Sequence, residues 1–261
     1  MFSFFESSRH LGRPVQLYLF KGADPTLESM MRSVTIIPGA TEFGYASTKV
    51  SKENGDPVNY IAGLPSTDYI GALEELITTA PHLKYVSIVV AWHGENLRLG
   101  SCQIRPRVEL SDTVTTPFEW KAGGIERGDA TQVSQIEDRP ALGGAPADRA
   151  IYQAIVAAKI RGLSVTLYPF IMMDIPTGNS LLNPYGGTGQ PVYPWRGRIT
   201  CNPAIGQPST ADKTSTARSQ IDLFFGDTNP EDIGWDSSEL KTTYSGLNQW
   251  RYRRFILTMA E

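Results

Sequence analysis

Two runs of the chain have the hydrophobic pattern of buried strands. Residues 85–92 (YVSIVVAW) are nearly continuous in apolar and β-branched side chains, which favours a strand covered on both faces, as in a parallel sheet. Residues 164–173 (SVTLYPFIMM) form a second run of strand-forming residues, and this run stops at Asp174 and Pro176. The pattern therefore predicts two main strands, the second of which ends on a carboxylate.

An amphipathic stripe precedes each of the two predicted strands, and these stripes predict helices. Ser66 is a suitable N-terminal cap for a first helix, which Pro81 ends, and Gly162 is a suitable stop for a second. Further helices are predicted around 211–225 and 249–260. The order strand, helix, strand predicts an α/β fold. The stripes consist of Tyr69, Ile70, Leu73, Leu76 and Ile77 in the first helix, and of Ala150, Ile151, Ala154, Ile155 and Ala158 in the second.

The beginning of the chain differs in pattern from the rest. Short strand patterns at 14–20 and 33–37 are followed by a polar, turn-rich stretch at 51–59, which we interpret as a linker or surface loop. We therefore expect an N-terminal segment with short strands over 1–60 and a main domain over 61–261.

Composition narrows the classes of function. At 261 residues and 41% hydrophobic, the chain can bury a sizeable core. A formal net charge of −3 and a pI near 5.7, without a basic stripe, argue against a general nucleic-acid binder. No apolar run approaches the roughly 20 residues that a membrane span needs. The cysteines and His10 and His82 lack metal-ligand spacing, and the glycine-rich segments lack phosphate-loop spacing. We therefore expect no metal and no cofactor.

Four stretches of the sequence resemble one known protein family. They are YVSIVVAWHGENLRLGSCQIRP, GLSVTLYPFIMMDIPTGN, NPYGGTGQPVYPWRGRITCNP and WRYRRFILTMAE. Together they resemble the glycoside-hydrolase-like TIM-barrel domain of the large tail-hub (baseplate) protein of bacterial gene transfer agents and related phage tails. The resemblance runs from about residue 25 to the C-terminus, and residues 1–24 do not share it.

The resemblance implies a component of a phage-tail or gene-transfer-agent particle, made in the bacterial cytoplasm. Its implied partners are other tail or baseplate proteins and the glycan of a cell envelope. In the family, the helix matching RRFILTMAE leads to a strand that ends in a Ser-Glu pair, and that Glu resembles a glycosidase acid/base. The present sequence stops before that strand. Since a full barrel takes about 250 residues, we expect an α/β fold with a partial, truncated TIM-barrel-like domain preceded by a short β-containing segment.

Two carboxylates are candidates for catalysis, because glycoside hydrolysis normally needs a pair of them flanking the scissile bond. In a barrel, site residues gather at the carboxyl ends of strands. Asp174 ends one predicted strand and Glu95 follows another, and Asp174 is the better candidate. The structural alternative, which we favour for both, is that Asp174 braces the turn at Pro176 and that Glu95 is solvated.

Aromatic and basic residues near the same strand ends are candidates for substrate binding. Trp92 can stack on a sugar and His93 can donate to a sugar hydroxyl, or the two residues can close the barrel rim. The loop at 175–209, rich in Gly and Pro, offers either a platform for glycan or protein, or a lid over the barrel mouth in which one of its arginines pairs with Asp174. We slightly favour the lid. The platform residues are Tyr193, Trp195, Arg196 and Arg198, and Arg196 and Arg198 are the two arginines.

These observations leave two functional hypotheses. The first is a structural or recognition module of a tail-hub protein, expected to be inactive because a general acid is missing. The alternative is a glycoside hydrolase acting on cell-wall or surface glycan. Loss of an acid/base group lowers the rate about 10²–10⁴-fold, so we expect the first. A parallel sheet that ends after a few strands also leaves an unpaired edge and an uncovered apolar face, which predicts dependence on a partner.

Overall fold

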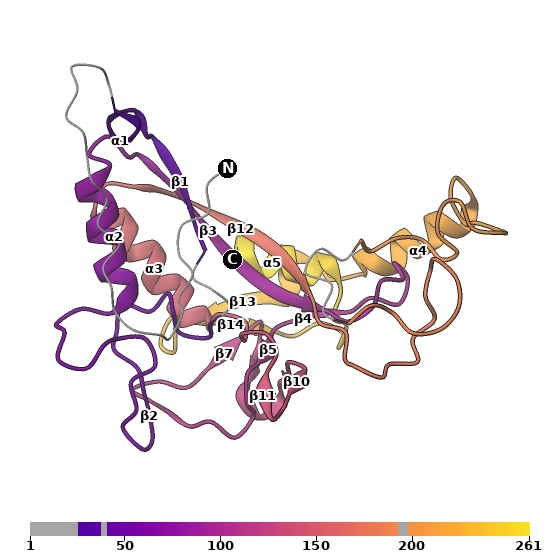
Figure 1. Ribbon diagram of the computed structural model, residues 1–261, viewed down its shortest axis with the longest axis horizontal. Coiled ribbons are helices and arrows are strands. Elements are labelled where there is room, and N and C mark those ends of the chain that lie inside the picture. Colours follow the sequence, from indigo (N-terminus) through magenta and orange to yellow (C-terminus); the bar gives the residue numbers. More distant parts are fainter. Residues whose placement is uncertain (1–25, 38–40, 193–197) are drawn as a thin grey trace.

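The computed structural model of the chain describes residues 26–37, 41–192 and 198–261, so the strand pattern at 14–20 lies outside the described residues. Within these ranges no helix is long and apolar enough to cross a membrane. Two 3-10 helices are present, η1 (Arg127–Asp129) and η2 (Pro230–Asp232). The α-helices (Figure 1) are α1 (Leu27–Met30), α2 (Asp68–Thr79), α3 (Asp148–Ile160), α4 (Ser215–Phe225) and α5 (Tyr252–Ala260).

The central sheet contains three parallel strands. Their order is β1 (Ser33–Ile36), β3 (Tyr85–Gly94) and β12 (Ser164–Met173), and β4 (Ile104–Arg105) pairs antiparallel with the carboxyl end of β3. The other strands form pairs: β2 (Ser51–Lys52) with β6 (Thr115–Thr116), β5 (Arg107–Val108) with β9 (Thr131–Gln132), β7 (Lys121–Ala122) with β8 (Ile125–Glu126), β10 (Gln135–Ile136) with β11 (Arg139–Pro140), and β13 (Ile233–Asp236) with β14 (Lys241–Tyr244).

The main elements predicted from the sequence are confirmed, with small shifts at their ends. The two long strands are β3 and β12, and α2 and α3 carry the two predicted stripes. Thr67 caps α2 in place of Ser66, since its side chain accepts a bond from the Ile70 N–H at 3.4 Å. After α3, Gly162 adopts a φ of 77°, the left-handed conformation that glycine adopts readily at the end of a helix.

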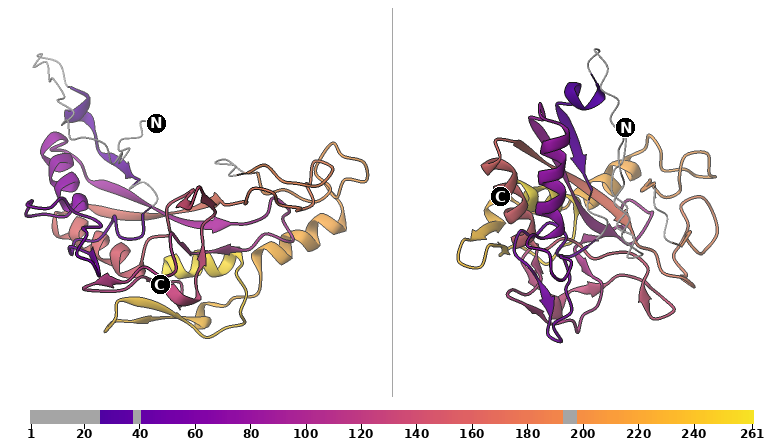
Figure 2. Two further views of the ribbon diagram at one scale, coloured as in Figure 1. Left: turned by 60° about the horizontal axis from the view of Figure 1, so that its bottom comes forward. Right: turned by 60° about the vertical axis from the view of Figure 1, so that its left-hand side comes forward.

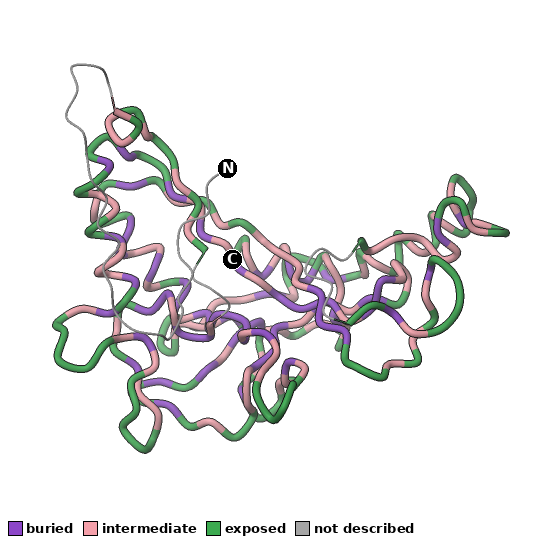
Figure 3. Tube along the Cα trace, viewed as in Figure 1, coloured by how far each residue is buried: buried purple, intermediate pink, exposed green. Residues whose placement is uncertain are grey.

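In the part of the chain that the structure describes, helices cover one face of the sheet and not the other. Val86, Ile88, Val90 and Trp92 of β3 point into the core and are buried, whereas the intervening residues are half-buried or exposed. Helices α3 and α5 pack against β12 on this core side (Figure 2). The alternation along the strands is visible in Figure 3. The expectation that 85–92 is covered on both faces is therefore not met in the described residues.

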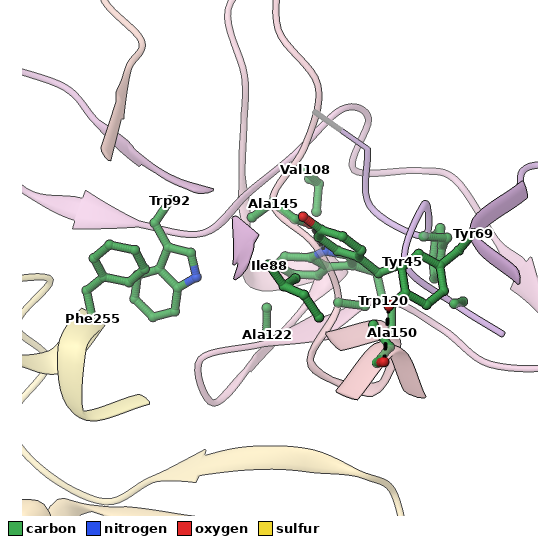
Figure 4. Close-up of a cluster of buried hydrophobic side chains, with 14 of the residues drawn as sticks. Tyr45, Tyr69, Ile88, Trp92, Val108, Trp120, Ala122, Ala145, Ala150 and Phe255 are labelled. Atoms are coloured by element: carbon green, nitrogen blue, oxygen red, sulfur yellow. Dashed lines mark hydrogen bonds between the residues drawn. The ribbon is translucent and has the colours of Figure 1, made fainter. Parts of the chain in front are cut away.

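Large aromatic side chains fill the core beneath the sheet (Figure 4). Trp92 stacks on Phe255 of α5 with ring centroids 4.9 Å apart, which joins the C-terminal helix to the sheet. The Trp120 indole N–H donates to the Ala145 carbonyl at 2.8 Å. The Tyr45 hydroxyl donates to the Val89 carbonyl at 2.6 Å. This side chain, which comes from the segment before β2, therefore supplies a hydrogen bond to β3 just beyond the end of β1.

The described strands form no barrel, and the predicted truncated TIM-barrel-like fold is wrong. In the described part of the main sheet, only β1, β3 and β12 run parallel as neighbours. The two-residue strands β5 and β9 form a separate parallel pair, and the later strands β13 and β14 pair with each other as a hairpin. The strand–helix repeat that a barrel needs ends at β12, because the next segment is a long loop that leads into α4. The fold is mixed α/β with small separate sheets. Since β1 belongs to the main sheet, the N-terminal segment contributes to it, and a boundary near residue 60 stays a prediction.

A buried carboxylate anchors the start of α3. Asp148 accepts bonds from the Thr242 N–H at 2.9 Å, the Thr242 hydroxyl at 2.6 Å and the Gly123 N–H at 3.2 Å. Gly123 is required here, because its φ is 59° and a Cβ would lie 2.5 Å from the Trp92 ring. Burial raises the pKa of Asp148 to about 6, and the bonds from Thr242 and Gly123 only partly oppose this.

This raised pKa predicts that Asp148 makes the folded chain more stable at low pH than at neutral pH. The folded chain binds the proton of Asp148 more tightly than the unfolded chain, so stability falls as the pH rises from 3.8 to about 6. Asp148→Asn removes that dependence. Relative to the unsubstituted chain, the free energy of unfolding of this variant should rise by up to about 3 kcal/mol across the interval. Urea unfolding at several pH values measures it, with the exposed Asp112→Asn as control. Parallel profiles for the two variants would contradict the assignment.

Candidate functional site

The predicted site residues meet where β3 and β12 end. Met173 lies beside Gly94 in the sheet register, and the Asp174 N–H donates to the Gly94 carbonyl at 2.8 Å. Consequently Asp174 and Glu95 emerge next to each other at the carboxyl edge of the sheet. The antiparallel strand β4 pairs with His93 and Gly94 and leads directly into β5, which starts at Arg107.

Asp174 is completely buried and bound to an arginine. Its side chain has 0% exposure, and Oδ2 lies 2.8 Å from Nη1 of Arg107. The Ser134 N–H also donates to Oδ2, at 3.0 Å. The Asp174 carboxylate thus accepts its hydrogen bonds from protein donors. Its negative charge, which has no contact with solvent, is compensated by the Arg107 guanidinium.

Arg107 bridges both candidate carboxylates. Its Nη2 lies 3.1 Å from Oε2 of Glu95, while Nη1 is bound to Asp174. The Arg107 side chain is 8% exposed and that of Glu95 is 31% exposed, so the cluster reaches solvent through Glu95. Arg105 adds a second cation, with Nη2 at 3.9 Å from the same Glu95 oxygen. The site therefore holds two acids between two arginines.

His93 completes the cluster as a neutral imidazole. It is fully buried, and Nε2 lies 3.1 Å from the Gly143 carbonyl, which assigns the ring proton to that nitrogen. Nδ1 has no hydrogen-bond partner among the described residues. Burial, reinforced by Arg107, lowers the pKa of His93 to about 4, and the opposing effect of Asp174 is smaller. The imidazole is therefore uncharged at neutral pH.

The expectation of an arginine bound to Asp174 is met by a different arginine. The partner is Arg107, whereas Arg198 is exposed and makes no ion pair with Asp174. Tyr193, Trp195 and Arg196 lie outside the described residues, so the lid and platform hypotheses stay predictions. Arg107 was missed because nothing in QIRPRVE marks a chain that folds back across the end of β3.

Trp92 is part of the core and not of a rim. Its side chain has 0% exposure, with Phe255 stacked on the ring and Trp250 packed edge-on at 6.0 Å between centroids. A sugar has no access to this ring in the observed conformation. Sequence reasoning placed Trp92 and His93 correctly at a strand end, but it did not foresee that α5 covers the tryptophan.

Two surface depressions lie away from the cluster. One of about 400 Å³ is lined by the segments around Asp112, Trp120 and Arg127. The other, of about 610 Å³, lies between α4 and the segment that precedes α5, next to Asp222 and Arg251. Neither is lined by Glu95, Asp174 or His93. Among the described residues, no group of three or more His, Cys, Asp or Glu side chains is placed to hold a metal ion.

Comparison with known proteins returns no match for this chain, either among protein-family models or among curated protein sequences. The chemical capacity of the site therefore rests on its own geometry. Its acids are held by arginines, its imidazole is buried and neutral, and only the Glu95 carboxylate is partly open to solvent.

Removing one partner of the buried ion pair should destabilise the chain strongly. Arg107→Met leaves the charge of Asp174 buried and uncompensated, so the free energy of unfolding should fall by about 3–5 kcal/mol. Combining it with Asp174→Asn should recover part of that loss, which a double-mutant cycle measured by urea unfolding will show as coupling. Arg105→Met is the matched control, because its longer contact with the half-open Glu95 predicts a change below about 1 kcal/mol. Additive losses would contradict the pairing.

The buried His93 predicts a loss of stability in acid. A histidine whose pKa falls from 6.5 to about 4 on folding is protonated first in the unfolded chain, so stability is lost as the pH drops through that interval. His93→Gln removes this contribution, so relative to the unsubstituted chain its free energy of unfolding should rise by up to about 3 kcal/mol as the pH drops from 6.5 to about 4. The sign is opposite to that of Asp148, so the unsubstituted chain should have a flatter profile than either variant. The exposed His82→Gln serves as control, and an unchanged acid slope in His93→Gln would contradict the prediction.

Proposed function

We propose that this chain is a non-catalytic structural or recognition component of a phage-tail or gene-transfer-agent particle. The observation that carries the proposal is the sealed ion pair of Asp174 with Arg107, because it occupies the better of the two candidate catalytic acids. A glycosidase needs both carboxylates at a cleft that admits the sugar. Here Asp174 has no exposed surface, and neither described depression contains the cluster.

The particle itself is supported by the sequence resemblance. The four motifs that resemble the tail-hub domain fall on β3, on β12, on the loop after β12 and on α5. They therefore cover the structural centre of the chain, and the resemblance does not depend on a closed barrel. Expected partners are other tail or baseplate proteins, and the expected further ligand is the glycan of a cell envelope.

One observation favours the second candidate function, a glycoside hydrolase. Glu95 keeps 31% of its side chain exposed and shares Arg107 with a second carboxylate, so two acids do stand side by side at a sheet edge. Conversion of this arrangement into a catalytic pair would require Asp174 to leave Arg107. Breaking this buried ion pair would leave an uncompensated charge away from solvent, which costs free energy. For this reason we prefer the structural function.

The two functions are separated by an assay on peptidoglycan sacculi. The purified chain should release no reducing ends above the background of Glu95→Gln and Asp174→Asn, with Asp112→Asn as a control for handling. In parallel, antibodies raised against the chain should label purified particles from cells that carry the gene. Hydrolysis that Glu95→Gln abolishes would replace the proposal with the hydrolase, and unlabelled particles would contradict the particle assignment.

A further inference from the structure

The outer edge of β12 carries an ordered row of backbone groups. Among the described residues, β12 pairs with β3 alone and lies at the edge of the sheet (Figures 1 and 2). The register of this pair runs without a bulge from Ser164 to Met173. The Ser164 N–H donates to the Lys84 carbonyl at 2.8 Å, and the Asp174 N–H donates to the Gly94 carbonyl at 2.8 Å. Because both ends of an unbroken strand donate inward at even positions, the backbone groups of the odd residues point outward.

Three of the outward residues present free donors and acceptors at the surface. Within the described part of the chain, no backbone or side-chain group bonds to the outward N–H and C=O groups of the half-buried residues Val165, Leu167 and Ile171, whereas Met173 is buried. The fifth outward residue is Pro169, which has no N–H to offer. A proline in the long strand is tolerated because its missing donor faces away from β3, so the ladder loses no bond.

We propose that the outer edge of β12 binds an extended segment of a different polypeptide as an additional strand. The proposal rests on the proposed recognition function and names its kind of partner. A row of alternating N–H and C=O groups selects an extended chain, because only a strand repeats its own groups at the same spacing. The bound segment lies beside half-buried Leu167 and Ile171 on the helix side and beside Tyr168 and Phe170 on the open side. It is therefore apolar on both faces.

Pro169 argues for a different polypeptide over a second copy of this chain. When two copies pair antiparallel through β12, hydrogen-bonded pairs join outward residues of both copies. Each Pro169 then faces an outward residue of the other copy. Because both copies contribute a Pro169, the ladder between them lacks two N–H donors. A different strand meets only one such gap.

The test selects linear peptides from a displayed library on the immobilised intact chain and measures amide exchange with the resynthesised peptides. The N–H groups of Leu167 and Ile171 should become protected, whereas that of Tyr168, which already faces β3, should not change. Peptides N-methylated on the residues that face β12 should lose binding, and peptides methylated on the alternate residues should keep it. Selected peptides that leave Leu167 and Ile171 exchanging as in the free chain would overturn the proposal.

A substitution on the chain gives an independent readout. Leu167→Pro removes one outward donor, as Pro169 does naturally, and should weaken peptide binding about fivefold, the value of one hydrogen bond. Thr166→Val, on the exposed part of the open face, is the matched control and should leave binding unchanged. If Leu167→Pro fails to fold, the N-methylated peptides decide alone. A concentration-dependent dimer that forms through the same amides would identify a second copy and overturn the proposal.

These outcomes are independent of the tests of the proposed function. Hydrolysis of sacculi and labelling of particles do not involve the edge of β12. A chain that is inactive and present in particles, but whose edge binds no peptide, keeps the proposed function and loses only this inference.

Discussion

The buried charge of Asp174 is the constraint on which the arrangement of this chain depends. The end of β12 places this carboxylate under complete cover, and an uncompensated charge there would cost several kcal/mol. Arg107 has to reach it, so the chain after β3 turns back as β4 and β5 across the end of the sheet. The same need for a counter-charge that shapes this region also removes Asp174 from the surface.

The pairing of β3 with β12 has two consequences of different kinds. It brings Asp174 next to His93 and Glu95 at one end of the sheet, although more than seventy positions of the sequence separate Asp174 from the other two. It also leaves the far side of β12 without a neighbour in the described residues. The cluster is closed by arginines and packing, whereas the edge remains available for pairing. The proposed recognition function therefore uses the outer edge of β12 and not a cleft at the cluster.

The sequence predicted those parts of the fold that have a strong period. Continuous apolar runs identified β3 and β12, and stripes identified α2 and α3, because burial on one face imposes those patterns. The short pairs from β4 to β11 have two residues each, too few for any period, so Arg107 and its bridge were not foreseen. The prediction of a truncated barrel was wrong for another reason. A local resemblance of strands and helices does not determine how many strands follow in the sheet, and here the repeat ends at β12.

The polarity of the open sheet face explains how a one-sided parallel sheet is tolerated. Parallel strands normally need cover on both faces. On this face the amino-terminal half presents Ser33, Thr35 and Thr166, whose hydroxyls are exposed and hydrated. The same face also carries the exposed rings of Tyr85 and Tyr168, and towards the carboxyl ends it becomes more apolar through Phe170 and Met172, which are half-buried. The apolar half adjoins the carboxylate–arginine cluster, so a partner that covers it would also approach Glu95, the acid of the cluster that reaches solvent. Recognition on this side would therefore combine an apolar contact with a charged one.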